Sequence, residues 1–120
     1  MLTIDQILAV QPAAVEKVTV PEWGGEVFIR PLTAAEVARL YQALDTTEES
    51  TRPPLASLVT AFSLCDEAGK PLVVAGEEMA LARKLGAQSY RAVKRVFRVA
   101  SRLSGFIEEE PEKNSETSRS

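Results

Sequence analysis

Apolar and polar positions alternate with a period of two in two short runs near the start of the chain. The runs flank Gly24-Gly25, with Val18 and Val20 before the pair and Val27 and Ile29 after it. A Gly-Gly pair between such runs supplies the positive φ angles that a two-residue hairpin turn requires. The pattern therefore predicts a β-hairpin over residues 16–31, with Val20 facing Ile29.

This hairpin should have two apolar faces, because side chains alternate across a sheet. One face collects the valine and isoleucine side chains, and the other collects Pro21, Trp23 and Phe28. Either the chain's own helices cover both faces, or one face contacts a partner through Trp23 and Phe28. In the competing interpretation, Trp23 is a core residue or a staple of the hairpin. Pro21 lacks an amide hydrogen, which favours an edge position for the first strand.

Outside the hairpin, apolar residues recur at spacings of three and four, which predicts helices. The expected helices cover residues 3–10, 33–44, 55–64, 77–85 and 90–104. Thr33 with Glu36 three residues later forms a capping box at the start of the second helix. We expect an α+β fold, in which the N-terminal hairpin packs on about four helices. Residues 72–74 are the candidate for a short third strand.

Three of these helices carry an apolar stripe that should form the core. The stripes are Val37, Leu40, Tyr41 and Leu44; Leu55, Leu58, Val59, Phe62 and Cys65; and Val93, Val96, Phe97, Ala100 and Leu103. On this pattern Cys65 is a buried structural thiol and not a nucleophile. Tyr41 and Tyr90 should be half-buried. The helix at 3–10 should dock on the core, and the polar segment 45–54 should be a mobile surface loop.

The hairpin and the helix start together carry a family resemblance. The run from Pro21 to Glu36 is Pro-Glu-Trp-Gly-Gly-Glu-Val-Phe-Ile-Arg-Pro-Leu-Thr-Ala-Ala-Glu. It resembles the tail assembly chaperones of long-tailed bacteriophages and prophages, in which such a hairpin precedes a helical body. The segment that begins Cys65-Asp-Glu and contains Gly69 and Leu72 follows the central helix, as in that family. The likeness covers about residues 14–107.

The resemblance implies an assembly chaperone without catalytic activity. Such proteins are made in the cytoplasm of infected or lysogenic bacterial cells, coat the tape measure protein and help recruit the major tail protein during tail tube assembly. They are absent from the mature virion. A homo-oligomer is also expected, because an edge strand or an apolar hairpin face invites a second copy.

The charge of the chain divides it into two parts. Residues 1–107, the expected chaperone domain, sum to zero, so the formal net charge of −3 belongs to residues 108–120. That tail sets Lys113 and Arg119 against Glu108, Glu109, Glu110, Glu112 and Glu116. It contains no apolar residue, so it cannot bury enough surface to offset its ordering entropy. We expect a disordered acidic tail.

The segment from Arg83 to Arg102 contains basic residues but no acidic residue. The last helix places five of them on or near one side: Arg91, Lys94, Arg95, Arg98 and Arg102. Three interpretations stay open, namely a solvated face, a nucleic-acid site, and a surface for an acidic protein segment. The acidic tail is one such segment and could fold back on these residues. The second interpretation gives the alternative function, a small nucleic-acid-binding regulatory protein.

The composition argues against catalysis. The chain has no histidine and a single cysteine, so the usual general base and the usual metal ligand are missing. Neighbouring carboxylates such as Glu48-Glu49 and Glu77-Glu78 lie in a loop and at a helix start, whereas catalytic carboxylates converge from separate elements. We therefore expect no enzyme activity, no cofactor and no metal. No apolar run approaches the roughly 20 residues of a membrane span, and no secretory leader opens the chain.

Overall fold

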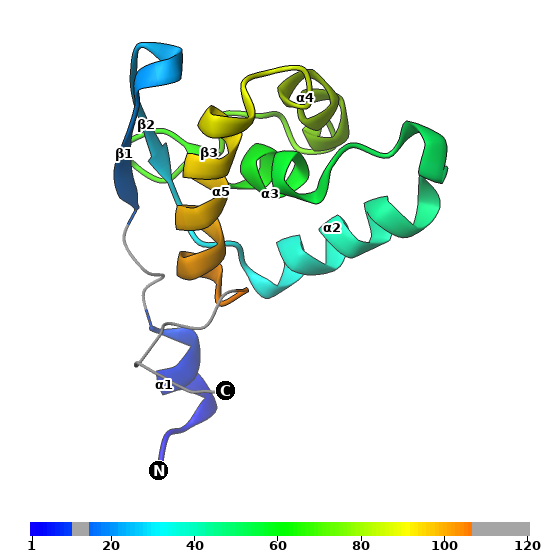
Figure 1. Cartoon of the computed structure of the whole chain (residues 1–120). Helices are drawn as coiled ribbons and strands as arrows, with labels where there is room; N and C mark the ends of the chain where they lie inside the picture. The colour runs from blue at the N-terminus through cyan, green and yellow to red at the C-terminus, as the bar shows by residue number, and fades with distance from the viewer. Residues whose placement is uncertain (11–14, 107–120) are drawn as a thin grey trace, which may run out of the picture.

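A three-stranded antiparallel sheet in the order β1-β2-β3 packs against helices in the computed structural model of the chain. The structure describes residues 1–10 and 15–106 (Figure 1). The elements are α1 (Ile4–Leu8), β1 (Glu16–Val20), η1 (Pro21–Trp23), β2 (Gly25–Ile29), α2 (Ala34–Thr46), η2 (Glu49–Thr51), α3 (Leu55–Ser63), β3 (Leu64–Cys65), α4 (Glu78–Leu85) and α5 (Tyr90–Ser104). The α+β prediction is confirmed. The expected disorder of residues 108–120 lies outside the described residues.

The hairpin turn is longer than the sequence suggested. Val20 pairs with Gly25 and Val18 with Val27, so the prediction that Val20 faces Ile29 is wrong. Residues Pro21–Trp23 leave the ladder as a 3-10 turn, which ends at Gly24 with φ 77°. Pro21 has no amide hydrogen for a ladder bond, whereas the Gly24 amide donates to the Val20 carbonyl at 3.1 Å. β1 is an edge strand, as the proline indicated.

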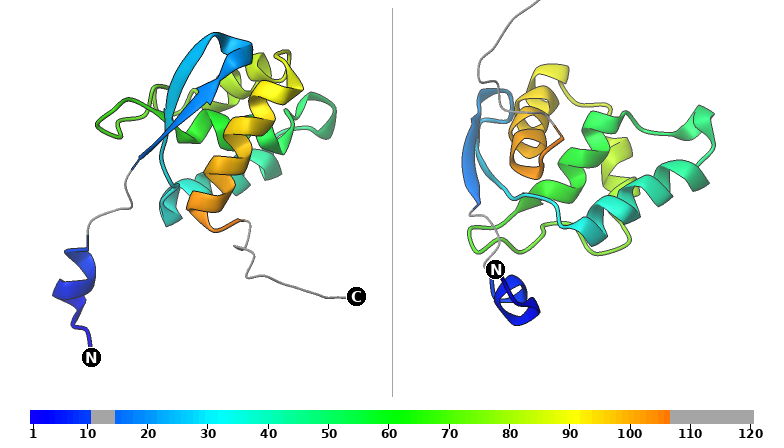
Figure 2. Two further views of the ribbon diagram at one scale, coloured as in Figure 1. Left: turned by 60° about the vertical axis from the view of Figure 1, so that its left-hand side comes forward. Right: turned by 90° about the horizontal axis from the view of Figure 1, so that it is seen from below.

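The register differs from the expected one by an even number of residues, so the valine and isoleucine side chains still share one face of the hairpin. Val20 and Ile29 are fully buried, and Val18 and Val27 pack against the core beside them. The valine and isoleucine face is therefore the inner face. α5 lies alongside this hairpin (Figure 2), where Val93, Val96 and Ala100 are buried, as its apolar stripe predicted.

The third strand is Leu64–Cys65, directly after α3, and not residues 72–74. The Asp66 carboxylate folds the next turn by accepting the amides of Ala68 and Lys70, both at 2.9 Å. Gly69 takes φ 89° there, which favours glycine. The returning chain makes a single bridge, between Cys65 and Pro71, and Leu72 and Val74 remain exposed. Cys65 itself is buried, as predicted, and burial raises the pKa of its thiol.

The central element is α3, which is buried on nearly all sides from Ser57 to Ser63. It packs against α5 on one side and against α4 on the other, and α2 crosses it with fewer contacts (Figures 1 and 2). The predicted stripes hold at Leu40, Leu58 and Val59. They fail at the margins. Leu55 and Tyr41 are 49% and 55% exposed, because the start of α3 and the outer side of α2 extend beyond the packed layer. Tyr90, at the start of α5, is 70% exposed, so the prediction that Tyr41 and Tyr90 are half-buried is wrong.

An ion pair joins the hairpin to α2 and α3. The Arg30 guanidinium binds the Glu36 carboxylate through both terminal nitrogens, with Nη1 to Oε1 at 2.8 Å, and Nη2 also donates to the Phe62 carbonyl at 3.0 Å. Glu36 closes the predicted capping box at Thr33. Burial raises the pKa of Glu36, but the hydrogen bonds from Arg30 and Thr33 together lower it by a larger amount. The pKa of Glu36 therefore lies below its usual value.

The short helix α1 does not dock on the core, contrary to the prediction. Thr3 and Gln6 form its capping box, but none of its residues is buried. Its apolar side chains recur at helical spacing, which predicts one apolar face on the helix. The spacing does not show which surface packs against that face. The polar segment 45–54 also has more structure than expected, since α2 continues to Thr46 and η2 follows. No helix among the described residues is long and apolar enough to cross a membrane.

Two serines near the end of α5 provide a matched test of buried hydrogen bonding. Ser101 is fully buried and its hydroxyl has no hydrogen-bond partner among the described residues, whereas the Ser104 hydroxyl accepts the Leu32 amide at 3.0 Å. We expect Ser101→Ala to raise the free energy of unfolding by up to about 1 kcal/mol and Ser104→Ala to lower it by about 1–2 kcal/mol. Urea denaturation followed by circular dichroism measures both. Equal effects in the two variants would contradict this account.

Candidate partner-binding surfaces

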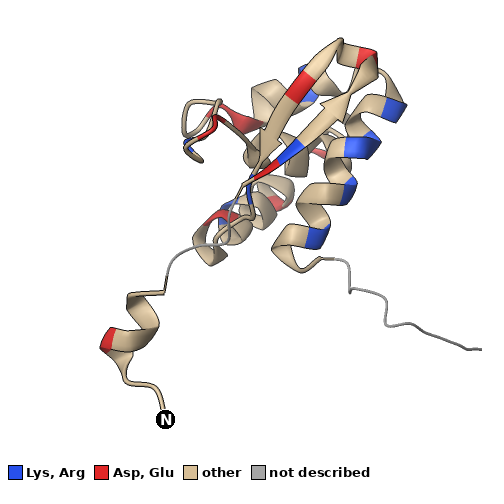
Figure 3. Cartoon of the chain, turned by 90° about the vertical axis from the view of Figure 1, so that its left-hand side faces the viewer, with Lys and Arg blue, Asp and Glu red and all other residues tan. Residues whose placement is uncertain are grey.

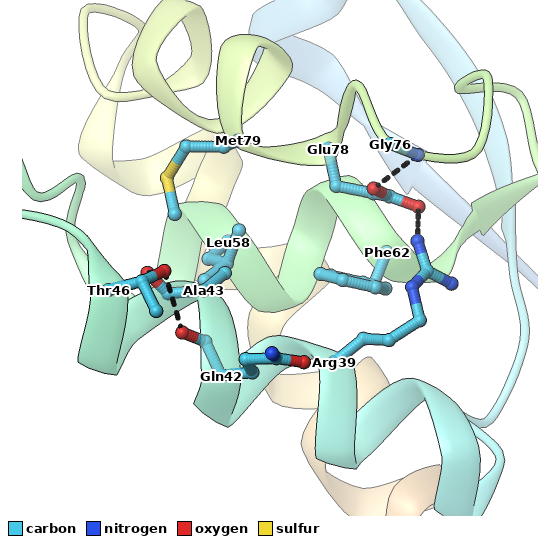
Figure 4. Close-up of a pocket in the computed structure, with 9 residues that line it drawn as sticks. All are labelled: Arg39, Gln42, Ala43, Thr46, Leu58, Phe62, Gly76, Glu78 and Met79. Carbon is cyan, nitrogen blue, oxygen red and sulfur yellow. Dashed lines mark hydrogen bonds and ion pairs between the residues drawn. The ribbon is translucent and has the colours of Figure 1, made fainter.

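The first candidate surface is a groove between α2 and the α3–α4 pair, with a volume of about 280 Å³. Its floor is apolar and consists of Ala43, Leu58, Phe62 and Met79. The rim is polar and consists of Arg39, Gln42, Thr46, Gly76 and Glu78. Figure 4 shows the Met79 side chain reaching from α4 toward α2, over the groove floor. An apolar floor with a polar rim is the usual chemistry of a site that accepts an apolar side chain or helix face.

One end of the groove is closed by an ion pair between α2 and α4. Arg39 reaches across to Glu78, and the other Glu78 oxygen accepts the Gly76 amide at 3.0 Å (Figure 4). The Arg39 guanidinium also lies over the Phe62 ring, 5.1 Å from its centroid, in a cation–π contact. The Glu78 side chain is 11% exposed and that of Arg39 is 43% exposed. Arg39 therefore keeps part of its guanidinium at the rim.

The second candidate surface is the basic side of α5, where the structure places all five predicted cations in exposed positions (Figure 3). Four of them, Arg91, Lys94, Arg95 and Arg98, line a shallow depression of about 250 Å³. The Lys94 ammonium lies over the Tyr90 ring, 5.7 Å from its centroid. Among the described residues, no ion pair involves Arg91, Lys94 or Arg98.

Two of the five cations bind the hairpin instead. Arg95 holds the Glu22 carboxylate at 2.9 Å, and Arg102 holds that of Glu16 at 2.9 Å. The hydrogen bond from Arg95 lowers the pKa of Glu22 below its usual value. Arg95 therefore links α5 to the tip of the hairpin, and Arg102 links it to the start of the hairpin. Of the five cations, those without an ion pair among the described residues are Arg91, Lys94 and Arg98.

The third candidate surface, a joint patch of Trp23 and Phe28, is not formed. Trp23 lies in the η1 turn, half-buried, and packs against the core next to α5. Phe28 alternates with the core-facing Val27 and Ile29, so it lies on the opposite side of the sheet, between Lys17 and Cys65 in the register. The expected face failed because it assumed that residues 21–23 continue the strand.

The groove was not foreseen from the sequence. Its ion pair joins residues that are 39 positions apart, and no local pattern marks such a pair. The apolar stripes did identify Leu58 and Phe62, but as core residues. In residues 1–10 and 15–106, no group of three His, Cys, Asp or Glu side chains could hold a metal ion.

Comparison of the chain with protein-family models, with curated proteins and with solved structures gave no match.

Proposed function

We propose that the chain is a non-catalytic phage tail assembly chaperone, which binds the tape measure protein and helps recruit the major tail protein. It would act in the cytoplasm of the bacterial host and leave before the virion is complete. The resemblance from Pro21 to Glu36 supports the family, and one structural observation supports the activity. That observation is the open groove between α2 and the α3–α4 pair, in which Ala43 and Met79 are half-buried above the buried side chains of Leu58 and Phe62.

The physical demands on such a chaperone fit the groove. Tape measure proteins are long and helical, so their soluble storage requires many modest contacts with the apolar faces of helices. A groove between helices binds one face of an amphipathic helix through side chains at spacings of three and four. A contact of this size is weak, since stable interfaces bury roughly 800 Å² per partner. Weak contacts suit a protein that must leave when the tube polymerises.

The test is suppression of precipitation of a tape measure fragment, taken from the gene next to that of the chain. We expect the chain to keep the fragment soluble and Ala43→Glu to weaken binding at least about tenfold, because a carboxylate enters the groove floor. Ala38→Glu is the matched control, since Ala38 is exposed on α2 and does not line the groove. Precipitation at the same rate with and without the chain, or equal effects of the two variants, would refute the proposal.

The alternative, a nucleic-acid-binding regulator, is supported by the depression along Arg91, Lys94, Arg95 and Arg98. Phosphate contacts from such residues would give an affinity that falls steeply as salt rises. The chaperone proposal expects no shift of duplex DNA at moderate salt. A salt-dependent shift that Arg91→Glu and Arg98→Glu abolish, with Ala43→Glu unchanged, would favour the regulator.

A further inference from the structure

The N-terminal helix α1 presents an apolar face that no other described residue covers. The large apolar residues of the helix and its flanks are between 49% and 77% exposed: Leu2, Ile4, Ile7, Leu8 and Val10. Ile4, Ile7 and Leu8 stand at spacings of three and four, so they form one face. Leu2 precedes the N-cap and Ile7 is the fourth helical residue, the positions of a hydrophobic staple. The sequence thus builds a single apolar face around the capped turn.

A five-residue helix is not stable on its own. Isolated helices shorter than about 12–15 residues are marginal in water, because the nucleus costs more than a few hydrogen bonds return. Capping helps, yet most helical stability in proteins comes from packing of the apolar face. In Figures 1 and 2, α1 lies apart from the rest of the fold. Within residues 1–10 and 15–106, no surface of the same copy covers the apolar face of α1.

The groove between α2 and the α3–α4 pair has the matching chemistry. Its half-buried apolar residues, Ala43 and Met79, can contact the face of Ile4, Ile7 and Leu8, as in other complexes of a helix in a groove. Asp5, the only charged side chain in α1, follows Ile4 at the edge of this face. The partly exposed guanidinium of Arg39 lies at the rim, where it would meet that carboxylate. The two surfaces therefore match in polarity, and Asp5 would approach the part of the Arg39 guanidinium that the pair with Glu78 leaves exposed.

The groove lies on the other side of the fold from β1, the strand that follows α1 in the sequence. β1 contacts β2 and α5, whereas the groove is formed by α2, α3 and α4 on the other side of the fold (Figure 1). One α1 is too small for a stable interface of roughly 800 Å² per partner, but reciprocal exchange doubles the contact. We propose that two copies exchange α1 helices, each docking in the groove of the other. This deepens the proposed function, because the exchanged helix would cover the groove until a client helix displaces it.

The experiment uses sedimentation of the purified chain alone, so it does not depend on the chaperone proposal. We expect a monomer–dimer equilibrium with a dissociation constant on the order of 10 μM, in the range of small transient interfaces. Ile4→Glu with Leu8→Glu should raise that constant at least about tenfold, and Ala43→Glu should do the same. Ala38→Glu and Leu72→Glu are controls and should leave it unchanged. Mixing the two defective proteins should restore part of the pairing, because one intact helix then meets one intact groove.

Several outcomes would overturn the exchange. A wild-type chain that stays monomeric at several hundred micromolar contradicts it, and so does a dimer that survives the Ile4→Glu, Leu8→Glu change. If Ala43→Glu leaves the dimer intact while the α1 variant breaks it, α1 occupies another surface. Circular dichroism melting verifies that each variant is folded. Precipitation assays with a tape measure fragment, run separately, report on the chaperone proposal and not on the exchange.

Discussion

Replacing Arg30 with methionine should lower the free energy of unfolding by about 3–5 kcal/mol, the usual cost of breaking a buried ion pair from one side. The Arg30 and Glu36 side chains are 11% and 16% exposed, so the carboxylate would remain in place without its partner. The Phe62 carbonyl would lose a hydrogen bond as well. Methionine keeps the apolar stem of the side chain, so the loss reports the charge and its hydrogen bonds. Urea denaturation followed by circular dichroism measures the change.

Two comparisons isolate the cause. Lys17→Met removes the same charge from an exposed pair with Glu26, where both side chains are more than half exposed, and should cost at most about 1 kcal/mol. Adding Glu36→Gln to Arg30→Met should recover stability, because glutamine keeps the cap at Thr33 without a buried charge. A double variant less stable than Arg30→Met, or equal effects at Lys17 and Arg30, would contradict the assignment.

The same pair should respond to acid with a definite sign. The pKa of Glu36 in the fold lies below the value of 4.5 for a free carboxyl. Its contribution is therefore complete above pH 4.5 and is lost as pH falls through the lower, folded pKa. The difference in stability between the wild-type chain and Arg30→Met should narrow below pH 4.5. A constant difference down to pH 3 would show that the guanidinium acts by packing alone.

Local chemistry explains which parts of the fold were predictable from the sequence. The capping box at Thr33, the stripe of α5 and the burial of Cys65 depend on residues within a few positions of one another. The valine and isoleucine face of the hairpin was also correct, because the register changed by an even number of residues, whereas the turn and the face with Trp23 were not. The strand Leu64–Cys65 was missed because two residues carry no measurable period.

The surfaces were harder to predict because they depend on how distant elements meet. The five cations of α5 were expected on one side and are exposed there. Arg95 pairs with Glu22 and Arg102 pairs with Glu16 because the hairpin lies along α5. The paired residues are 73 and 86 positions apart in the sequence. The groove depends in the same way on how α2 crosses α3. A periodic pattern shows which face of a helix is apolar. It does not show how much of that face the neighbouring helices cover.

Truncating Phe62 to alanine should have the second large effect, a loss of about 3–5 kcal/mol in the free energy of unfolding. The ring is 3% exposed, forms part of the groove floor and supports the Arg39 guanidinium from below. Alanine would leave a cavity beneath the groove and remove the cation–π contact. Phe62→Leu is the matched control, because it keeps most of the volume and should cost less than about 2 kcal/mol, including the lost contact with Arg39.

The comparison also separates packing from the polar contacts of this residue. The bond from Arg30 goes to the Phe62 carbonyl, so neither substitution removes it. If packing holds the floor, urea denaturation should place Phe62→Ala well below Phe62→Leu. Losses of equal size in the two variants would mean that the contact with Arg39, and not the filled volume, supports the floor. Since α2 makes few other contacts with α3, a floor that depends on Phe62 would also make the width of the groove depend on this single ring.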